Sequence, residues 1–320
     1  MKAEPSSAGG APPPAAPAPS AATSSPGVAL TRWRVGVAAM RPRTLSLAVT
    51  PVLLGSALAW AEGAPLHLAA LLAALACALL IQIGTNLHND VADFKRGTDD
   101  SRRIGPLRVT AAGWVRPETM VRASIGCFVA ALLLGVTLVD IGGWPILLAG
   151  LASLAAGWCY SGGPRPISHG AWGELFVLVF FGLVAVAGSH WLQSGTPALD
   201  AWIGGAALGL PAAAVLLVNN YRDLEGDLRS GRCTLVARLG SARARRVYAA
   251  LMLLPALPVL ALAWRGRPGA LLALLVLPFA IRLVRRLGRQ PPGPWLNAQL
   301  AATAKASALL GLLLAAGVMW

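Results

Sequence analysis

The stretch LAALLAALACALLIQIGTNLHNDVADFKRGTDD runs from Leu68 to Asp100 and joins a long apolar segment to a dense group of acidic residues. Its apolar part is as long as the roughly 18 residues that an α-helix needs to cross a hydrocarbon core. Its second half holds four of the thirteen acidic residues in the chain, Asp90, Asp93, Asp99 and Asp100. The stretch therefore predicts a membrane helix that ends in an acidic cluster.

The whole chain has the composition of a polytopic helical membrane protein. Of its 320 residues 56% are hydrophobic and 12% are charged, with a mean hydropathy of +0.63, whereas soluble proteins carry about 25% charged residues. Apolar runs of helix length recur, without the polar/apolar alternation of an outer-membrane barrel. We predict an all-α bundle of nine transmembrane helices in the lipid bilayer, at residues 44–61, 67–90, 119–139, 143–160, 172–193, 200–222, 243–264, 268–288 and 297–319.

The first residues of the chain differ from the rest. Residues 1–28 are rich in Ala, Pro, Ser and Gly, which predicts a disordered tail. They lack the charged start and continuous apolar core of a signal peptide. We therefore expect one transmembrane domain at residues 29–320. The four cysteines, Cys77, Cys127, Cys159 and Cys233, show no metal-binding spacing.

The basic residues indicate how the chain lies in the membrane. The net charge of +14 is explained better by topology than by nucleic acid binding, because arginines gather in alternate connections. The amino-terminal flank, the segments around 95–122 and 222–246, and the end of the eighth span are rich in Arg, while the opposite side offers only Arg265 and Arg267. We expect a plasma (inner) membrane protein with its amino terminus and both long loops in the cytoplasm, and its carboxyl terminus outside.

A second acidic cluster lies on the same predicted membrane side. The stretch VNNYRDLEGDLRSGRCTLVARLG begins at Val218 and contains Asp223, Glu225 and Asp227. Residues three or four apart share one face of a helix. Asn86, Asp90 and Asp93 therefore align on one helix, and Asn219, Asp223 and Asp227 align on another.

Carboxylates gathered this closely repel one another, and a divalent cation relieves the repulsion. Oxygen ligands suit Mg²⁺, which shares its coordination sphere with substrate phosphates. The nearby basic residues can hold the remaining phosphate charge; they are Lys95, Arg102, Arg103, Arg108, Arg232 and Arg238. One such cluster alone is often a solvated helix end. Two asparagine-led clusters on one membrane side favour a site for a metal and a diphosphate, with apolar helices below it for a lipid tail.

These motifs resemble those of a known family. The segments NLHNDVAD from Asn86 and DLEGD from Asp223 resemble the two aspartate-rich motifs of the UbiA-type intramembrane prenyltransferases, which have nine transmembrane helices. Within that superfamily, YSGGPRPISHGAWGELFVLVFFGLVAVAGSHWLQ from Tyr160 resembles the branch that prenylates 1,4-dihydroxy-2-naphthoate. The resemblance covers about residues 35–319. Gly97 replaces a third aspartate of the superfamily pattern, and the naphthoate branch shares this glycine.

The resemblance implies a reaction and its residues. An all-trans polyprenyl diphosphate ionises at a Mg²⁺ site, and the acceptor ring attacks the allylic carbon with loss of its carboxyl group, giving demethylmenaquinone. The implied metal and catalytic residues are Asp90, Asp93, Asp223 and Asp227. The implied substrate-binding residues are Asn86, Asn89, Lys95, Arg102, Arg103, Tyr160, Arg165, Asn219 and Arg232.

Other interpretations lead to different expectations. A secondary transporter would place charges deep within its spans, and here only Lys305 lies clearly inside one; it either snorkels to the surface or faces the cavity. A CDP-alcohol phosphotransferase would carry one continuous aspartate motif, which neither cluster shows. Within the superfamily, 4-hydroxybenzoate and homogentisate are alternative acceptors. Glu174 begins the fifth span, where helix capping and acceptor binding are equally good explanations. The tail length, the number of metals and the oligomeric state stay open.

Overall fold

The computed structural model describes residues 32–97, 104–105 and 108–320. The predicted tail therefore lies outside the described residues, which contain helices and no strands. The elements are α1 (Arg32–Met40), η1 (Pro42–Thr44), α2 (Ser46–Ala61), α3 (Leu68–Lys95), α4 (Pro117–Ser161), η2 (Ile167–His169), α5 (Gly173–Val177), η3 (Leu178–Val184), α6 (Ala185–Ser194), α7 (Leu199–Arg229), α8 (Leu235–Leu253), α9 (Ala256–Trp264), η4 (Pro268–Val276), α10 (Leu277–Arg289) and α11 (Leu296–Val318).

The long helix α4 is a hairpin. Gly143 within it has a φ of 67°, a left-handed conformation that glycine adopts without a steric cost. Phe128 and Trp158 would lie about 45 Å apart on a straight helix, yet their ring centroids are 5.9 Å apart. Both halves pack on α3. The break predicted between the spans 119–139 and 143–160 is therefore confirmed, and α4 supplies both of these spans.

The nine predicted spans correspond to nine segments of the described chain, with small shifts at their ends. Six helices are long and apolar enough to cross a membrane, or seven if the bent pair Trp33–Thr44 and Ser46–Ala61 is one span. The remaining difference comes from the hairpin α4, which counts as two, and from the paired segments η4 and α10. The main boundary change is that α3 and α7 continue to Lys95 and Arg229, so both acidic motifs lie on helices.

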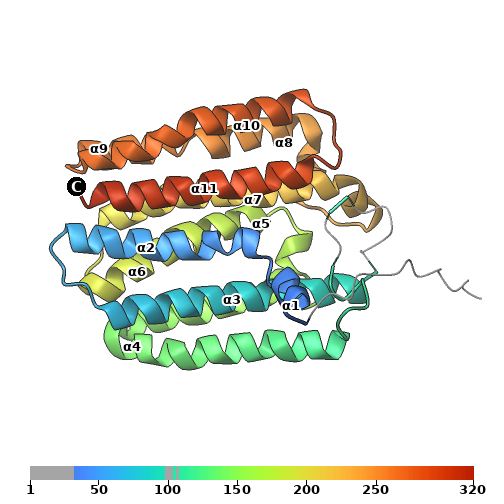
Figure 1. Cartoon of the computed structure of the whole chain (residues 1–320), viewed down its shortest axis with the longest axis horizontal. Coiled ribbons are helices and arrows are strands. Elements are labelled where there is room, and N and C mark those ends of the chain that lie inside the picture. Colours follow the sequence, from blue (N-terminus) through green and yellow to red (C-terminus); the bar gives the residue numbers. More distant parts are fainter. Residues whose placement is uncertain (1–31, 98–103, 106–107) are drawn as a thin grey trace, which may run out of the picture.

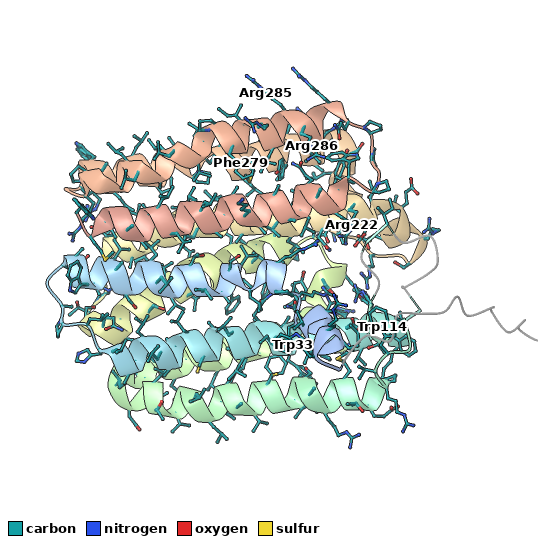
Figure 2. All side chains as sticks on the ribbon, viewed as in Figure 1. Trp33, Trp114, Arg222, Phe279, Arg285 and Arg286 are labelled. Carbon is teal, nitrogen blue, oxygen red and sulfur yellow. The ribbon has the colours of Figure 1, made fainter. Side chains whose placement is uncertain are left out.

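The helices lie side by side along one long axis (Figure 1), and charge is divided between the two ends. Arg222, Trp33 and Trp114 lie at the end where α3 and α7 finish (Figure 2). At the opposite end the basic residues predicted outside are paired with acids: both Arg265 and Arg267 contact Asp200, and Arg267 lies 3.9 Å from Glu62. The first end is thus strongly basic and the second nearly balanced.

Close glycine contacts hold the bundle together. A Cβ added to Gly182 would lie 2.4 Å from the carbonyl oxygen of Gly205 on α7. Gly55 of α2 makes an equally close approach to the backbone of Val186, and Gly269 to that of Gly317. Membrane helices associate through such small residues, because lipid tails provide no hydrophobic driving force between helices.

Gly182 lies in η3, a π-helical segment, and its contact with α7 leads to a stability prediction. Gly182→Ala should lower the unfolding temperature, because the new methyl group meets backbone atoms that have no room to move; overpacking of this kind costs about 1–3 kcal/mol. Gly126→Ala on α4 is the matched control, since nothing lies within 4 Å of its added Cβ. It should leave stability unchanged or raise it slightly. Thermal unfolding in detergent measures both, and equal shifts would contradict the packing argument.

Candidate active site

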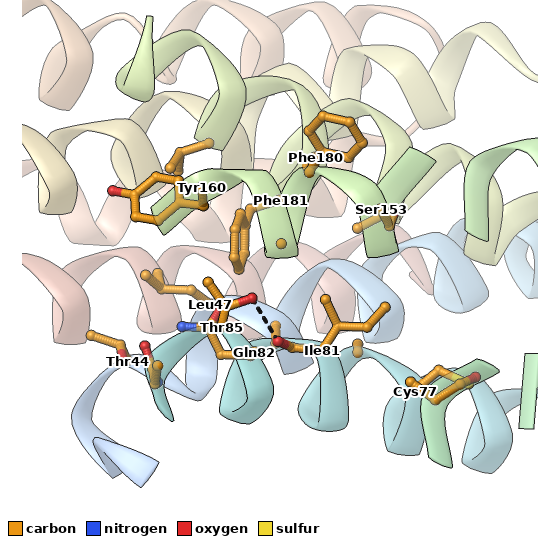
Figure 3. Close-up of a pocket in the computed structure, with 18 of the residues that line it drawn as sticks. Thr44, Leu47, Cys77, Ile81, Gln82, Thr85, Ser153, Tyr160, Phe180 and Phe181 are labelled. Carbon is orange, nitrogen blue, oxygen red and sulfur yellow. Dashed lines mark hydrogen bonds between the residues drawn. The ribbon is translucent and has the colours of Figure 1, made fainter. Parts of the chain in front are cut away.

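A cavity of about 1100 Å³ runs through the bundle between α2, α3, α4, η3 and α7. Along α3 it extends from Asp90 to Ala74, which is about 24 Å at 1.5 Å per residue. Its deeper part is lined by apolar side chains such as Leu138, Ile146 and Leu192. Tyr160, Phe180 and Phe181 form one wall, opposite Leu47 and Ile81 (Figure 3). The cavity therefore suits a long apolar chain.

The polar end of the cavity carries the first acidic motif. Asn86, Asn89 and Asp90 line it. Of the three residues predicted to share one helix face, Asn86 and Asp90 line the cavity and Asp93 does not. The Asp90 carboxylate accepts hydrogen bonds from the backbone N–H groups of Val109 at 3.3 Å and Thr110 at 3.0 Å. The Asn86 side chain donates to the Met40 carbonyl at 2.9 Å. These bonds tie α1 and the loop after α3 to the mouth of the cavity.

The two acidic motifs meet at one arginine. Asp93, which is 2% exposed, forms ion pairs with Arg108 and Arg232. Arg232 also lies 3.7 Å from the carboxylate of Asp227. Asp93 of α3 and Asp227 of α7 are more than 130 residues apart in the chain, and the fold brings both to the same guanidinium group.

Arg222 organises the second motif. It donates to both carboxylate oxygens of Asp223, at 2.8 and 2.7 Å, and to Asn219 at 2.9 Å. It also donates to Asn297 of α11 at 3.1 Å. Arg222, Asn219 and Asn297 line the cavity, whereas Asp223 lies behind them. A cationic group bound in this way is oriented for an anion at the cavity mouth.

Several arginines at the mouth are not among the predicted substrate-binding residues. Arg34, Arg41 and Arg43 line the cavity beside Arg108 and Arg222. Arg41 has a φ of 54°, the one positive φ outside glycine among the described residues. Backbone strain of this kind clusters at binding sites. The only sequence signal for this conformation is the segment Arg41-Pro42-Arg43. A proline disfavours the helical conformation at the residue that precedes it.

The structure does not bring all the predicted ligands together. Asn89, Tyr160 and Asn219 line the cavity, but Lys95 and Arg165 are exposed and lie outside its lining. Asp99, Asp100, Arg102 and Arg103 fall outside the described residues. His88 stacks on Trp158 at 4.3 Å and does not line the cavity. Lys305 is exposed on α11 away from the cavity.

The loops beside the site are joined to each other. The backbone N–H of Cys233 donates to the carbonyl of His169 at 2.9 Å. Burial, with smaller effects of the Arg232 and Arg96 guanidinium groups, lowers the pKa of His169 to about 4. His169 is therefore neutral near pH 7 and adds no positive charge to this end.

The donor set fits Mg²⁺ held together with a phosphate ligand. Asp90 and the amide side chains of four asparagines supply oxygen atoms at the cavity mouth, and Mg²⁺ commonly takes one or two carboxylates, waters and substrate phosphates. No three His, Cys, Asp or Glu side chains of the described residues converge as a closed metal cage. The other aspartates are paired with arginines, whose charge an anionic ligand can share.

The fold and the cavity together define an integral membrane protein with an intramembrane site for an amphipathic, anionic ligand. Comparison with known proteins identifies its family. The model of the UbiA prenyltransferase family matches residues 48–298. The chain belongs to the UbiA prenyltransferase family.

Individual relatives agree with this assignment. The chain is 37% identical to the 1,4-dihydroxy-2-naphthoate octaprenyltransferase of Escherichia coli K12, over 90% of this chain and 96% of that protein. It is 36% identical to the protein of the same name from Mycobacterium tuberculosis, over 77% and 83% of the two chains. A UbiA homolog from Archaeoglobus fulgidus bound to GPP and Mg²⁺ shares the fold, with a TM-score of 0.63, 15% identity, and coverage of 89% of this chain and 99% of that chain.

Proposed function

We propose that the protein transfers a polyprenyl group from an all-trans polyprenyl diphosphate to 1,4-dihydroxy-2-naphthoate, with loss of the carboxyl group, to give demethylmenaquinone in its reduced, quinol form. The observation that carries this proposal is the amphipathic cavity, whose polar mouth includes Asp90 and Asn219 from the two motifs and whose interior is apolar. The naphthoate acceptor is supported by the names of the relatives and by the segment from Tyr160.

The polyprenyl diphosphate is proposed to lie along the cavity, with its diphosphate at the mouth and its tail inside. Arg41, Arg108 and Arg222 face the mouth and neutralise the diphosphate as it leaves. The apolar walls hold the polyprenyl tail and keep water from the allylic cation. Eight isoprene units extend to about 36 Å, by scaling from the 3.3–3.6 Å of three backbone bonds, so an octaprenyl tail exceeds the 24 Å of cavity beside α3 and continues into the lipid.

We assign Asp90, Asp93, Asp223 and Asp227 to Mg²⁺ and the diphosphate. The bound ion supplies positive charge that stabilises the departing diphosphate. Asp90 is oriented by two backbone amides. The other three aspartates form ion pairs with arginines: Asp93 with Arg108 and Arg232, Asp223 with Arg222, and Asp227 with Arg232. Each negative charge therefore has a positive partner without a bound ligand.

The polar mouth is proposed to face the cytoplasm of a plasma membrane, with the carboxyl terminus outside. Arg-rich helix ends gather at the mouth (Figure 2), and the positive-inside rule places such ends in the cytoplasm. The carboxyl terminus lies at the other end of the bundle (Figure 1).

The test of this function is a prenylation assay. Purified membranes are incubated with Mg²⁺, a polyprenyl diphosphate and, separately, 1,4-dihydroxy-2-naphthoate, 4-hydroxybenzoate or homogentisate. We expect a prenylated product from the naphthoate, and we expect EDTA to abolish it and added Mg²⁺ to restore it. Prenylation of only another acceptor would overturn the naphthoate assignment and keep the prenyltransferase. No prenylation of any acceptor would overturn both.

A further inference from the structure

A buried carboxylate outside both acidic motifs lies beside the cavity. Glu174, in the first turn of α5, is 5% exposed. Phe176 and Val177, two and three residues later, line the cavity. Glu174 itself does not line the cavity, but Asn219, which precedes its hydrogen-bond partner Asn220, does. Glu174 therefore lies next to cavity-lining residues of both α5 and α7.

Only one of the two Glu174 carboxylate oxygens is satisfied. Asn220 of α7 donates to Oε1 at 3.0 Å, and Asn220 directly follows the cavity-lining Asn219. Oε2 is fully buried and has no hydrogen-bond partner among the described residues. A buried polar atom without a partner costs about 1–3 kcal/mol. Such an atom in a native site calls for a ligand or a function.

Helix capping does not account for this arrangement. An acidic residue in a first turn gains about 0.3–1 kcal/mol from the helix dipole when it is exposed. Glu174 is instead buried, and Asn220 of α7 donates a hydrogen bond to its carboxylate. The dipole also leaves Oε2 without a hydrogen-bond donor.

The surrounding side chains indicate the chemistry of the missing donor. Tyr160, Phe176, Phe180 and Phe181 present aromatic surface to this part of the cavity, which suits a flat ring. A carboxylate oxygen is an acceptor only, so the ring that fits must carry an O–H or N–H group. The arginines that would hold a diphosphate line the mouth of the same cavity.

We propose that Glu174, positioned by Asn220, binds a ring hydroxyl of the aromatic acceptor through Oε2 and takes its proton during prenyl transfer. This inference rests on the proposed function. The O–H bond breaks, the proton moves to Oε2, and the oxygen electron pair enters the ring. The ring carbon that carries the carboxylate bonds to the allylic carbon as the C–O bond to diphosphate breaks. Loss of CO₂ then returns an electron pair to the ring oxygen, which recovers its proton from Glu174.

The test compares acceptors as well as variants. The full-length wild type, Glu174→Gln and the control Glu118→Gln, which changes an exposed glutamate, are assayed with 1,4-dihydroxy-2-naphthoate and with its two monohydroxy analogues. We expect the wild type to lose about 10- to 100-fold in kcat/KM on the analogue that lacks the contacted hydroxyl. With 1,4-dihydroxy-2-naphthoate, the kcat/KM of Glu174→Gln should fall by a similar factor relative to the wild type. With the analogue that lacks the contacted hydroxyl, the kcat/KM of Glu174→Gln should be close to that of the wild type. Glu118→Gln should match the wild type.

A binding measurement separates this role from a structural one. Thermal stabilisation by a polyprenyl diphosphate without acceptor should be the same in Glu174→Gln and in the wild type. If Glu174→Gln does not fold, Asn220→Ala takes its place. The kcat/KM of Asn220→Ala should then fall more with 1,4-dihydroxy-2-naphthoate than with the analogue that lacks the contacted hydroxyl. Equal losses on all acceptors, in whichever variant folds, would overturn the proposal. A wild type that prenylates no dihydroxynaphthoate would instead refute the proposed function.

Discussion

Asp90→Ala should abolish prenyl transfer while the protein still inserts and folds. Asp90 is the motif aspartate that lines the cavity itself, and it is oriented by the amides of Val109 and Thr110. Its charge holds the metal and diphosphate in the proposed mechanism. Loss of a single preorganised charge-stabilising group commonly costs 10²- to 10³-fold in kcat, and we expect at least that. Asp223→Ala should show a comparable loss.

A second substitution separates the chemistry from the architecture. Asp90→Asn keeps an oxygen that can accept from one loop amide, yet it removes the negative charge. It should lose as much activity as Asp90→Ala and unfold closer to the wild-type temperature. Asp140→Asn, on the exposed surface of α4, is the matched control. Turnover by Asp90→Asn near the wild-type rate would remove the argument for a metal at this carboxylate.

Arg222→Gln should have the second largest effect. The Arg222 guanidinium group connects Asp223, Asn219 and Asn297, and it is 6% exposed. Glutamine removes its charge and most of these hydrogen bonds, so the partly exposed Asp223 loses its cationic partner. We expect kcat/KM for the polyprenyl diphosphate to fall about 100-fold or more, with weaker stabilisation by that substrate in thermal unfolding.

The control for Arg222 uses an arginine on the outer surface. Arg285 is exposed on α10 (Figure 2), and Arg285→Gln should leave the kinetics unchanged. If Arg222→Gln and Arg285→Gln behave alike, Arg222 has no part in diphosphate binding. A fall in stability without a fall in kcat/KM would assign Arg222 to the fold alone.

The ion pairs at this end of the bundle keep its buried charges compensated. Buried ion pairs add little net stability, because desolvation offsets their attraction. Asp93 and Arg108 are both nearly buried, and each is compensated while the site is empty. In the proposed mechanism, the metal offers a new partner to the aspartate and the diphosphate offers one to the arginine.

Much of the fold follows from local features of the sequence. Apolar runs long enough to cross a bilayer mark the nine spans, since a lipid-exposed backbone must satisfy its own hydrogen bonds. Gly142-Gly143 marks the reversal within α4, because a left-handed residue favours glycine. The three- and four-residue spacing in both motifs places their acids along one helix face. These inferences depend on period and composition alone.

The tertiary structure decided which side chains meet. The sharing of Arg232 by Asp93 and Asp227, the bond from Asn86 to Met40, and the pairing of Glu174 with Asn220 join residues far apart in the chain. Lys95 follows the first motif directly, yet it is exposed and outside the cavity. Helical periodicity sets the face on which a residue lies, but the packing of helices determines what that face touches. The sequence alone therefore determined a membrane bundle with two acidic motifs, and only the packed helices decided which arginines hold them and where a cavity lies beneath.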